Sequence, residues 1–289
     1  MKRLGSILLL VLLASSAESQ QPQKLNVSIP LIAKASHHHP TSITAESLVI
    51  SDGKAHVSTA SLVNGIDLPL ELGILIDTSG SQQKEPLEDI LNAMNEFAVE
   101  SIRGAEDKVF FLPFEAKPDA TKWIKKEELG TTKITVGIRG GTALYDALAM
   151  ASNQLMGPRD WRKPTRRILI LISDGDDNVS HITHGDAESA AIRAGAVIFV
   201  IDTDHSGFHT GGIIMENWAK ATGGQLFAPS GKKDIAKAFA SIKEQLDSMY
   251  YLTYEPINPS KNSFREVEVK AAVQNEKLEL SYARQYFWN

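Results

Sequence analysis

The stretch GILIDTSGS, residues 73–81, carries an apolar run directly into a group of small polar residues. Asp77, Ser79 and Ser81 each offer a side-chain oxygen immediately after the run. An uninterrupted apolar run bounded by such residues predicts a strand that is covered on both faces of its sheet. Taken alone, the polar end fits a helix cap, half of a metal site or the nucleophile loop of a phosphatase.

The rest of the central region repeats this pattern of buried strands and adds helices between them. Apolar runs without alternation occupy residues 72–76, 109–114, 168–173, 197–201 and 225–227. Apolar residues recur at helical spacing in segments 87–98, 144–155 and 235–246. Alternating strands and helices predict an α/β fold with a doubly wound, mostly parallel sheet.

The regions on either side of this α/β pattern carry a different signal. Residues 43–72 contain short strand-like runs separated by a turn, and three strand-like segments follow at 250–256, 263–273 and 277–287. We expect these flanks to pack together as one small β-subdomain. Residues 21–42 are polar and interrupted by proline, and no strand is predicted there. The predicted division is therefore a signal peptide at 1–17, a β-rich flank at 18–69, the α/β domain at 70–249 and a second β-rich flank at 250–289.

The first residues and the composition bear on where the protein works. Lys2 and Arg3 precede a short apolar run, and Ser15 and Ala17 stand where a signal peptidase prefers small residues. This pattern predicts export, to the periplasm or the medium. The chain has no cysteine, which excludes disulfides and attachment of lipid to a cysteine. No later segment is apolar enough to span a membrane, and a net charge of −5 gives no reason to expect nucleic-acid binding.

Polar residues at the carboxyl ends of separate strands predict a metal site. Asp77, Ser79 and Ser81 follow the first buried strand, Asp174 follows the third, and Thr142 lies in a Gly-rich loop before a helix. In open α/β sheets, ligands bind outside the carboxyl ends of the strands. Two carboxylates and three hydroxyls, with no nitrogen or sulfur, suit Mg²⁺, Mn²⁺ or Ca²⁺. We expect Mg²⁺ as the bound ion.

These residues resemble the metal-ion-dependent adhesion site of von Willebrand factor A domains. That site has the pattern Asp-x-Ser-x-Ser followed by a distant Thr and a distant Asp, which DTSGS, Thr142 and Asp174 match. The resemblance covers roughly residues 70–249. The segments GGTALYDAL, RILILISDGDDN and RAGAVIFVID are further similar to secreted von Willebrand A-related proteins abundant in Acidobacteria. This resemblance implies an exported A domain with β flanks and no established enzymatic activity. It also implies that one coordination position of the metal is open to an Asp or Glu carboxylate of a partner protein.

Two other functions remain open from the residues. A haloacid-dehalogenase-type phosphohydrolase, dependent on Mg²⁺, also places an Asp after its first strand, but its general acid would stand at Ser79. A serine cannot donate a proton to a leaving group at neutral pH as a carboxylic acid can. The other alternative is a scaffold in which the metal is structural and the β flanks bind the partner.

Several other polar clusters are expected to have no ligand. Asp176 and Asp177 are expected in a solvated acidic loop, with a supporting role beside the metal ligands as the less favoured alternative. The basic segment RDWRKPTRR, residues 159–167, is expected in a solvated loop at the opposite end of the sheet. His205 and His209 are expected in a loop, near Asp202 and Asp204, that does not fix the spacing of metal ligands. The run His37 to His39 is expected to be exposed coil.

Overall fold

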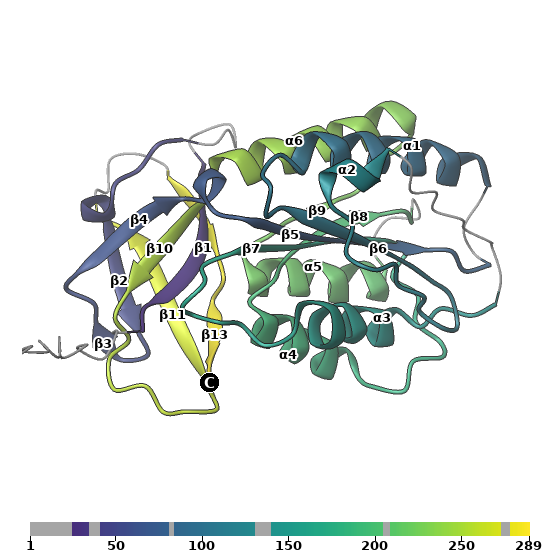
Figure 1. The fold of residues 1–289 in the computed structure, drawn as a ribbon. Helices are drawn as coiled ribbons and strands as arrows, with labels where there is room; N and C mark the ends of the chain where they lie inside the picture. Colours follow the sequence, from purple (N-terminus) through teal and green to yellow (C-terminus); the bar gives the residue numbers. More distant parts are fainter. Residues whose placement is uncertain (1–24, 35–40, 81–83, 131–139, 205–208, 273–277) are drawn as a thin grey trace, which may run out of the picture.

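The protein consists of an α/β part and a β-sheet part that lie side by side (Figure 1). The structure is a computed structural model, and it describes residues 25–34, 41–80, 84–130, 140–204, 209–272 and 278–289. The His37 to His39 run therefore lies outside the described residues, as does the predicted signal peptide. Among the helices that the structure describes, none combines the length and the apolar character needed to cross a membrane.

A five-stranded parallel sheet forms the centre of the α/β part, as the sequence predicted. Its spatial order is β6-β5-β7-β8-β9, so the chain moves from β5 to one edge and then returns to the other side of β5. The point between β5 and β7 is thus where the direction of winding reverses, and in such sheets this point is the usual ligand crevice. The strands are β5 (Leu70–Asp77), β6 (Lys108–Phe114), β7 (Arg166–Ser173), β8 (Val197–Asp202) and β9 (Leu226–Phe227).

Helices cover both faces of this sheet (Figure 1). One face packs against α1 (Lys84–Ser101) and α6 (Lys232–Ser248), with the short α2 (Lys126–Leu129) at the same side. The other face packs against α3, α4 and α5. Their bounds are α3 (Leu144–Met150), continued by a π-helical segment (Ala151–Met156), α4 (His184–Ala194) and α5 (Thr210–Thr222).

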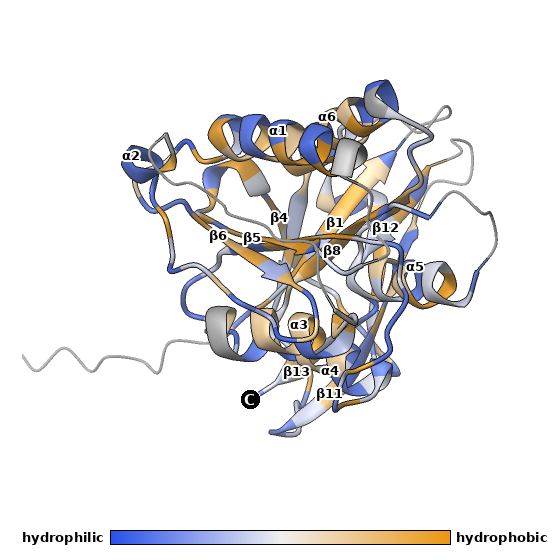
Figure 2. Cartoon of the chain, turned by 90° about the vertical axis from the view of Figure 1, so that its right-hand side faces the viewer, coloured by the Kyte–Doolittle hydropathy of each residue, from blue (hydrophilic) through white to orange (hydrophobic). Residues whose placement is uncertain are grey.

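Burial on both faces explains the unbroken apolar runs in the sequence. Ile74 and Ile76 belong to the core beneath α1 and α6, whereas the intervening Leu75 belongs to the core that contains α3, α4 and α5. The strands are accordingly hydrophobic along most of their length between the two helical layers (Figure 2). Each fully buried residue of this kind contributes about 1.5–3 kcal/mol relative to an exposed one.

The flanks form two four-stranded antiparallel sheets that share a core, which confirms the predicted β-subdomain. The orders are β12-β1-β10-β4 and β13-β11-β2-β3. Strand β1 (Val27–Lys34), in the segment for which no strand was predicted, is buried at every position and lies between two partners. The other strands are β2 (Leu48–Asp52), β3 (Ala55–His56), β4 (Ala60–Asn64), β10 (Tyr250–Tyr254), β11 (Ser263–Ala271), β12 (Glu279–Tyr282) and β13 (Gln285–Trp288), with 3-10 turns at Ala45–Ser47 and Gly65–Asp67.

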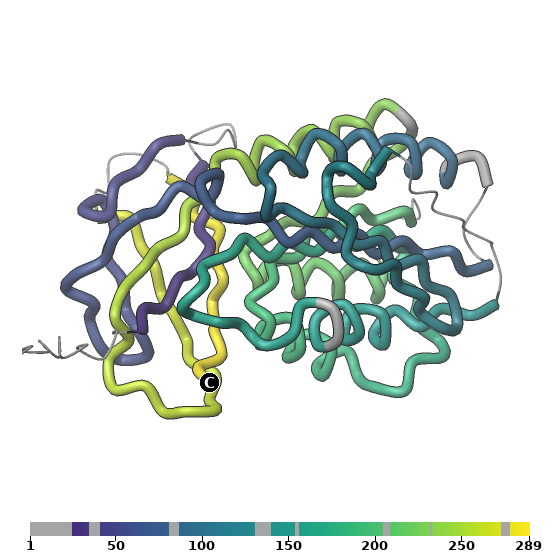
Figure 3. The backbone as a smooth tube through the Cα atoms, in the orientation of Figure 1, coloured from purple at the N-terminus to yellow at the C-terminus, as the bar shows by residue number. Residues whose placement is uncertain are grey.

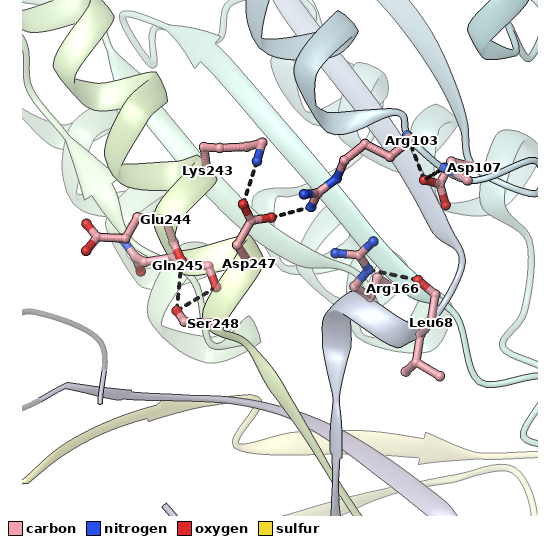
Figure 4. Close-up of polar contacts among 10 residues, drawn as sticks. Leu68, Arg103, Asp107, Arg166, Lys243, Glu244, Gln245, Asp247 and Ser248 are labelled. Atoms are coloured by element: carbon pink, nitrogen blue, oxygen red, sulfur yellow. Dashed lines mark hydrogen bonds and ion pairs between the residues drawn. The ribbon is translucent and has the colours of Figure 1, made fainter. Parts of the chain in front are cut away.

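Polar contacts fix the end of the α/β part that faces the β sheets. The chain enters the α/β part before β5 and leaves it after α6 (Figure 3). At this junction Arg103 pairs with Asp247 of α6, and Arg166 Nε donates to the Leu68 carbonyl at 3.1 Å (Figure 4). The Asp107 carboxylate accepts from the backbone N–H groups of Leu70 and Arg103. These contacts hold α1, α6 and the start of β5 together.

The basic segment 159–167 lies at this junction, and the expectation that it is a solvated loop is wrong for part of it. Arg159 and Arg166 are buried, and Arg167 Nε forms an ion pair with Glu71 at 2.9 Å. Arg162 and Lys163 are exposed as expected. Arg166 and Arg167 already belong to β7, and the β sheets lie against this end of the domain. Burial of the arginines therefore comes from packing that the local sequence pattern does not record.

Candidate metal site at the carboxyl edge of the sheet

Asp77 is the centre of the polar group at the point where the sheet reverses its winding. It is the last residue of β5, is 1% exposed, and lies next to the end of β7. Its Oδ1 accepts from the backbone N–H of Ser79 at 2.9 Å, and its Oδ2 accepts from Ser173 Oγ at 2.7 Å. Ser79 is also 1% exposed. The first loop of the predicted site is therefore folded onto its own carboxylate.

Burial and a neighbouring carboxylate both disfavour the ionised form of Asp77. Burial raises its pKa, hydrogen bonds from Ser173 and Ser79 lower it, and the nearby carboxylate of Asp174 raises it again. Among the described residues, no lysine or arginine contributes to the pKa shift of this carboxylate. A buried carboxylate normally has a cationic partner or coordinates a metal. These residues therefore fit a divalent cation, which would neutralise both carboxylates.

Hydrogen bonds between loops bring Thr142 to the same edge. Thr142 is 2% exposed, and its N–H donates to Asn178 Oδ1 at 2.9 Å. The Thr142 carbonyl accepts in turn from the N–H of Asn178 at 3.1 Å. The N–H of Gly80 donates to the Gly140 carbonyl at 3.3 Å. The loops that carry Asp77, Thr142 and Asp174 are thus joined.

Asp177 and Asn178 position this loop system. From the sequence, such a role was the less favoured alternative for Asp177, and none was predicted for Asn178. Asp177 is half-buried instead of solvated, because its Oδ2 accepts from the Tyr145 N–H at 3.0 Å and from Ser180 Oγ at 2.6 Å. The carboxylate holds the first turn of α3, the helix that follows Thr142. Asp176 is exposed, as expected. The doubled aspartate and the asparagine in GDDN were the available signal, but the partners Tyr145 and Thr142 lie more than thirty positions away in the chain.

Four of the five predicted ligands lie within the described residues at one edge of the sheet, and Ser81 lies outside them. Asp77, Ser79, Thr142 and Asp174 present two carboxylates and two hydroxyls. Among the residues described, no three His, Cys, Asp or Glu side chains form a group suited to a metal ion. The predicted site needs only two ligands of those types, since its remaining ligands are hydroxyls. This donor set suits a hard cation such as Mg²⁺.

His209, at the end of β8 that carries Asp202, forms hydrogen bonds with other protein groups. Asp202 ends β8 and His209 caps α5, so they do not lie in a free loop as the sequence suggested. His209 Nε2 lies 3.0 Å from Asp202 Oδ2, and its Nδ1 accepts from the Gly212 N–H at 3.1 Å. Asp204 and Glu216 line a cavity of about 410 Å³ beside them, while His205 lies outside the described residues. With both ring nitrogens occupied, His209 serves to begin α5.

Comparison with solved structures identifies folds that resemble this one. A von Willebrand factor type A protein from Catenulispora acidiphila is 12% identical with a TM-score of 0.49, and the match covers 93% of this chain and 75% of that one. The vWF domain of the type V pili tip protein Mfa5 from Porphyromonas gingivalis is 12% identical with a TM-score of 0.48, over 62% and 95% of the two chains. The structural neighbours include von Willebrand factor A domains.

A third structure, an aerotolerance-related membrane protein from Bacteroides fragilis carrying multiple mutations to serine, is 18% identical with a TM-score of 0.45, over 62% of this chain and 98% of that one. No protein-family model and no curated protein matches the chain. With identities of at most 18% and TM-scores below 0.5, these likenesses assign neither a site nor a function to this protein. The adhesion-site pattern and the similarity to the Acidobacteria proteins stay predictions.

Proposed function

We propose that this protein is an exported binding module that holds one divalent cation at the carboxyl edge of its sheet and binds a partner protein through it. The observation that carries the proposal is that Asp77 is buried beside Asp174. Among the described residues, no lysine or arginine lowers the pKa of the Asp77 carboxylate. The proposed ligands are Asp77, Ser79, Ser81, Thr142 and Asp174.

The charges of these ligands favour binding over catalysis. Two carboxylates balance a divalent cation, and three neutral hydroxyls add ligands without adding negative charge. The cation, with Mg²⁺ expected and Mn²⁺ or Ca²⁺ as alternatives, would supply a positive centre that attracts an Asp or Glu carboxylate of the partner. Because Ser79 occupies the position where a phosphohydrolase of the haloacid-dehalogenase type needs an acid, the residues favour binding over ester hydrolysis.

Capture of a partner with and without the cation tests this proposal. The purified protein is immobilised and exposed to an envelope extract of the source organism in Mg²⁺ or in a chelator. Asp174→Ala removes one proposed ligand, and the matched control Asp176→Ala removes an exposed carboxylate from the same loop. We expect a specific partner that is lost in the chelator and in Asp174→Ala but retained by Asp176→Ala.

Two outcomes would contradict the proposal. Capture of the same partner in the chelator and by Asp174→Ala would favour the scaffold with binding at the β flanks. Release of phosphate from a generic phosphate ester, dependent on Mg²⁺ and abolished in Asp77→Asn, would favour the phosphohydrolase.

A further inference from the structure

The cavity of about 410 Å³ beside Asp202 lies at the ends of β8 and β9, at the same edge of the sheet as the proposed metal site. Its walls come from the end of β8, the first turns of α5, and the segment between β9 and α6. Ligand-binding cavities in proteins commonly have volumes of about 300–1,000 Å³. This cavity is therefore large enough to receive an amino-acid side chain.

One part of the cavity wall is apolar. Ile213 of α5 is 42% exposed, and Leu226 and Pro229 line the same cavity. A ligand that covers these side chains removes apolar surface from water, which favours binding. The cavity thus suits a ligand that has an apolar portion.

Three carboxylates line the rest of the cavity and make it acidic. They belong to Asp202, Asp204 and Glu216, and no lysine or arginine of the described residues lines it. His209 also lines the cavity, but it adds no positive charge. Its Nδ1 accepts from the Gly212 N–H and therefore carries no proton in this arrangement. A cleft with charges of one sign attracts ligands of the opposite charge, so this cavity favours a cation.

The cation that fits is an organic group and not a metal ion. In the part of the chain that the structure describes, no three His, Cys, Asp or Glu side chains are grouped so as to hold a metal. Lys220 pairs with Glu216 at 2.7 Å, but their side chains are 58% and 41% exposed, so water screens this pair. The side chain of a lysine or arginine packs its aliphatic stem on apolar surface and keeps its charged end in a polar environment. Such a side chain matches both parts of the wall.

The cavity lies next to the loop that carries Asp174. Gly211, in the first turn of α5, packs so closely on this loop that a Cβ atom there would lie 2.3 Å from the Gly175 carbonyl oxygen. Gly212, the next residue of α5, lines the cavity. Because a stable protein interface buries about 800 Å² on each partner, a protein bound at the metal would reach the cavity as well.

We propose that this cavity receives a lysine or arginine side chain of the partner protein, near the acidic residue that the metal attracts. The stem of that side chain packs on Ile213 and Leu226, and its positive end lies close to Asp204 and Glu216. The identity of the partner rests on the proposed function, whereas the cavity itself holds the cationic side chain without the metal. The partner's binding surface should therefore carry a basic residue near its acidic one.

Titration of N-acetyl-L-arginine amide and N-acetyl-L-lysine amide into the full chain, in a chelator, tests the cavity directly. N-acetyl-L-norleucine amide is the matched control, because it has a similar stem without the charge. With the two cationic probes, we expect saturable NMR shifts at the backbone amides of Ile213 and Glu216. With the neutral probe, we expect none. The same shifts with all three probes, or none with any of them, would overturn the proposal.

A double variant tests the role of the carboxylates. Asp204→Asn with Glu216→Gln removes two carboxylates from the cavity wall, and the control Asp176→Asn with Glu106→Gln removes two exposed carboxylates elsewhere. Because one ion pair near the surface contributes up to about fivefold in affinity, binding of the arginine probe should weaken by about 5–25-fold in the double variant. It should change less than about twofold in the control. Unchanged affinity in the double variant would overturn the proposal.

Capture of the partner in Mg²⁺ separates this inference from the proposed function. The double variant should capture less partner than the wild type and the control do. Equal capture by the double variant would overturn the inference and leave the proposed function intact. Failure of the proposed function gives a different result, in which no partner is captured in Mg²⁺ while the cationic probes still bind in the chelator.

Discussion

Substitution of the glycine that follows Asp174 should disturb the metal site through the backbone. Gly175 has φ +79°, and a Cβ atom there would lie 2.6 Å from the carbonyl carbon of Gly211 at the start of α5. Real Cβ atoms do not approach backbone this closely, so in Gly175→Ala either α5 or the loop must move. Since the loop contains Asp174 and also Asn178, which bonds Thr142, its movement would displace two proposed ligands.

The magnitude follows from comparison with a glycine of similar backbone and no close neighbour. Gly53 has φ +61° and nothing within 4 Å of its would-be Cβ. In both Gly→Ala variants the positive φ lowers the free energy of unfolding by about 1–2 kcal/mol. The lower conformational entropy of the unfolded chain raises it by about 0.4–1 kcal/mol. Only Gly175→Ala adds overpacking, worth about 1–3 kcal/mol. The difference between the variants should therefore be about 1–3 kcal/mol, or about 2–12 °C in Tm.

Thermal unfolding in a chelator, followed by titration with Mg²⁺, measures both effects. We expect Gly175→Ala to unfold at the lower temperature and to bind Mg²⁺ more weakly than Gly53→Ala, which should bind like the wild type. Equal stability of the two variants would refute the predicted clash. A stability loss with unchanged Mg²⁺ affinity would refute the link between this loop and the metal.

Three further predictions concern pH, the flanks and export. Burial raises the pKa of Asp77 above its value in the unfolded chain, so ionisation of Asp77 destabilises the metal-free fold. This loss of stability grows as pH rises through the raised pKa, and it vanishes below about pH 4, where Asp77 is protonated in both states. The Tm advantage of Asp77→Asn in chelator should therefore shrink on acidification, and an advantage independent of pH would contradict this origin. A chain cut to residues 70–249 should melt lower and bind more apolar dye than the full chain, because Ile32 and Tyr251 belong to the core beneath α6; unchanged melting would show that the flanks are independent. Mass spectrometry of protein recovered outside the cytoplasm should find an N-terminus between about residues 18 and 24, and a full-length N-terminus would contradict a cleaved signal peptide.

The strands of the central sheet could be predicted because both faces are buried, and such strands leave unbroken apolar runs. Strand β1 could not, because Ser28 and Pro30 interrupt its apolar run and Lys34 ends it. Lys34 is tolerated because its Nζ donates to Gln225 across the junction at 2.6 Å. Helix α5 was not assigned because its first turn contains Gly211 and Gly212, which are poor helix formers. In these places contacts between distant segments decide the structure.

The predicted ligands of the metal site could be chosen from the sequence because each directly follows a strand or precedes a helix. The residues that position them could not be chosen in this way. Ser173 is the last residue of a buried strand, yet its hydroxyl donates to Asp77 from 96 positions away. The burial of Arg159 likewise depends on β strands from both ends of the chain. Such pairings leave no local periodicity in the sequence.

Calorimetric titration of Mg²⁺ into the wild type, Ser81→Ala, Asp174→Ala and Asp176→Ala tests the central claim most directly. The two aspartate variants remove the same charge from one loop, but only Asp174 is a proposed ligand. We expect Asp176→Ala to bind nearly as the wild type does, and Ser81→Ala, which removes a neutral oxygen, to bind more weakly. Asp174→Ala should lose more affinity than Ser81→Ala, and more than the roughly 10–100-fold that loss of an outer-shell partner costs. Equal Mg²⁺ affinity in the wild type and Asp174→Ala would contradict the metal site and the function proposed from it.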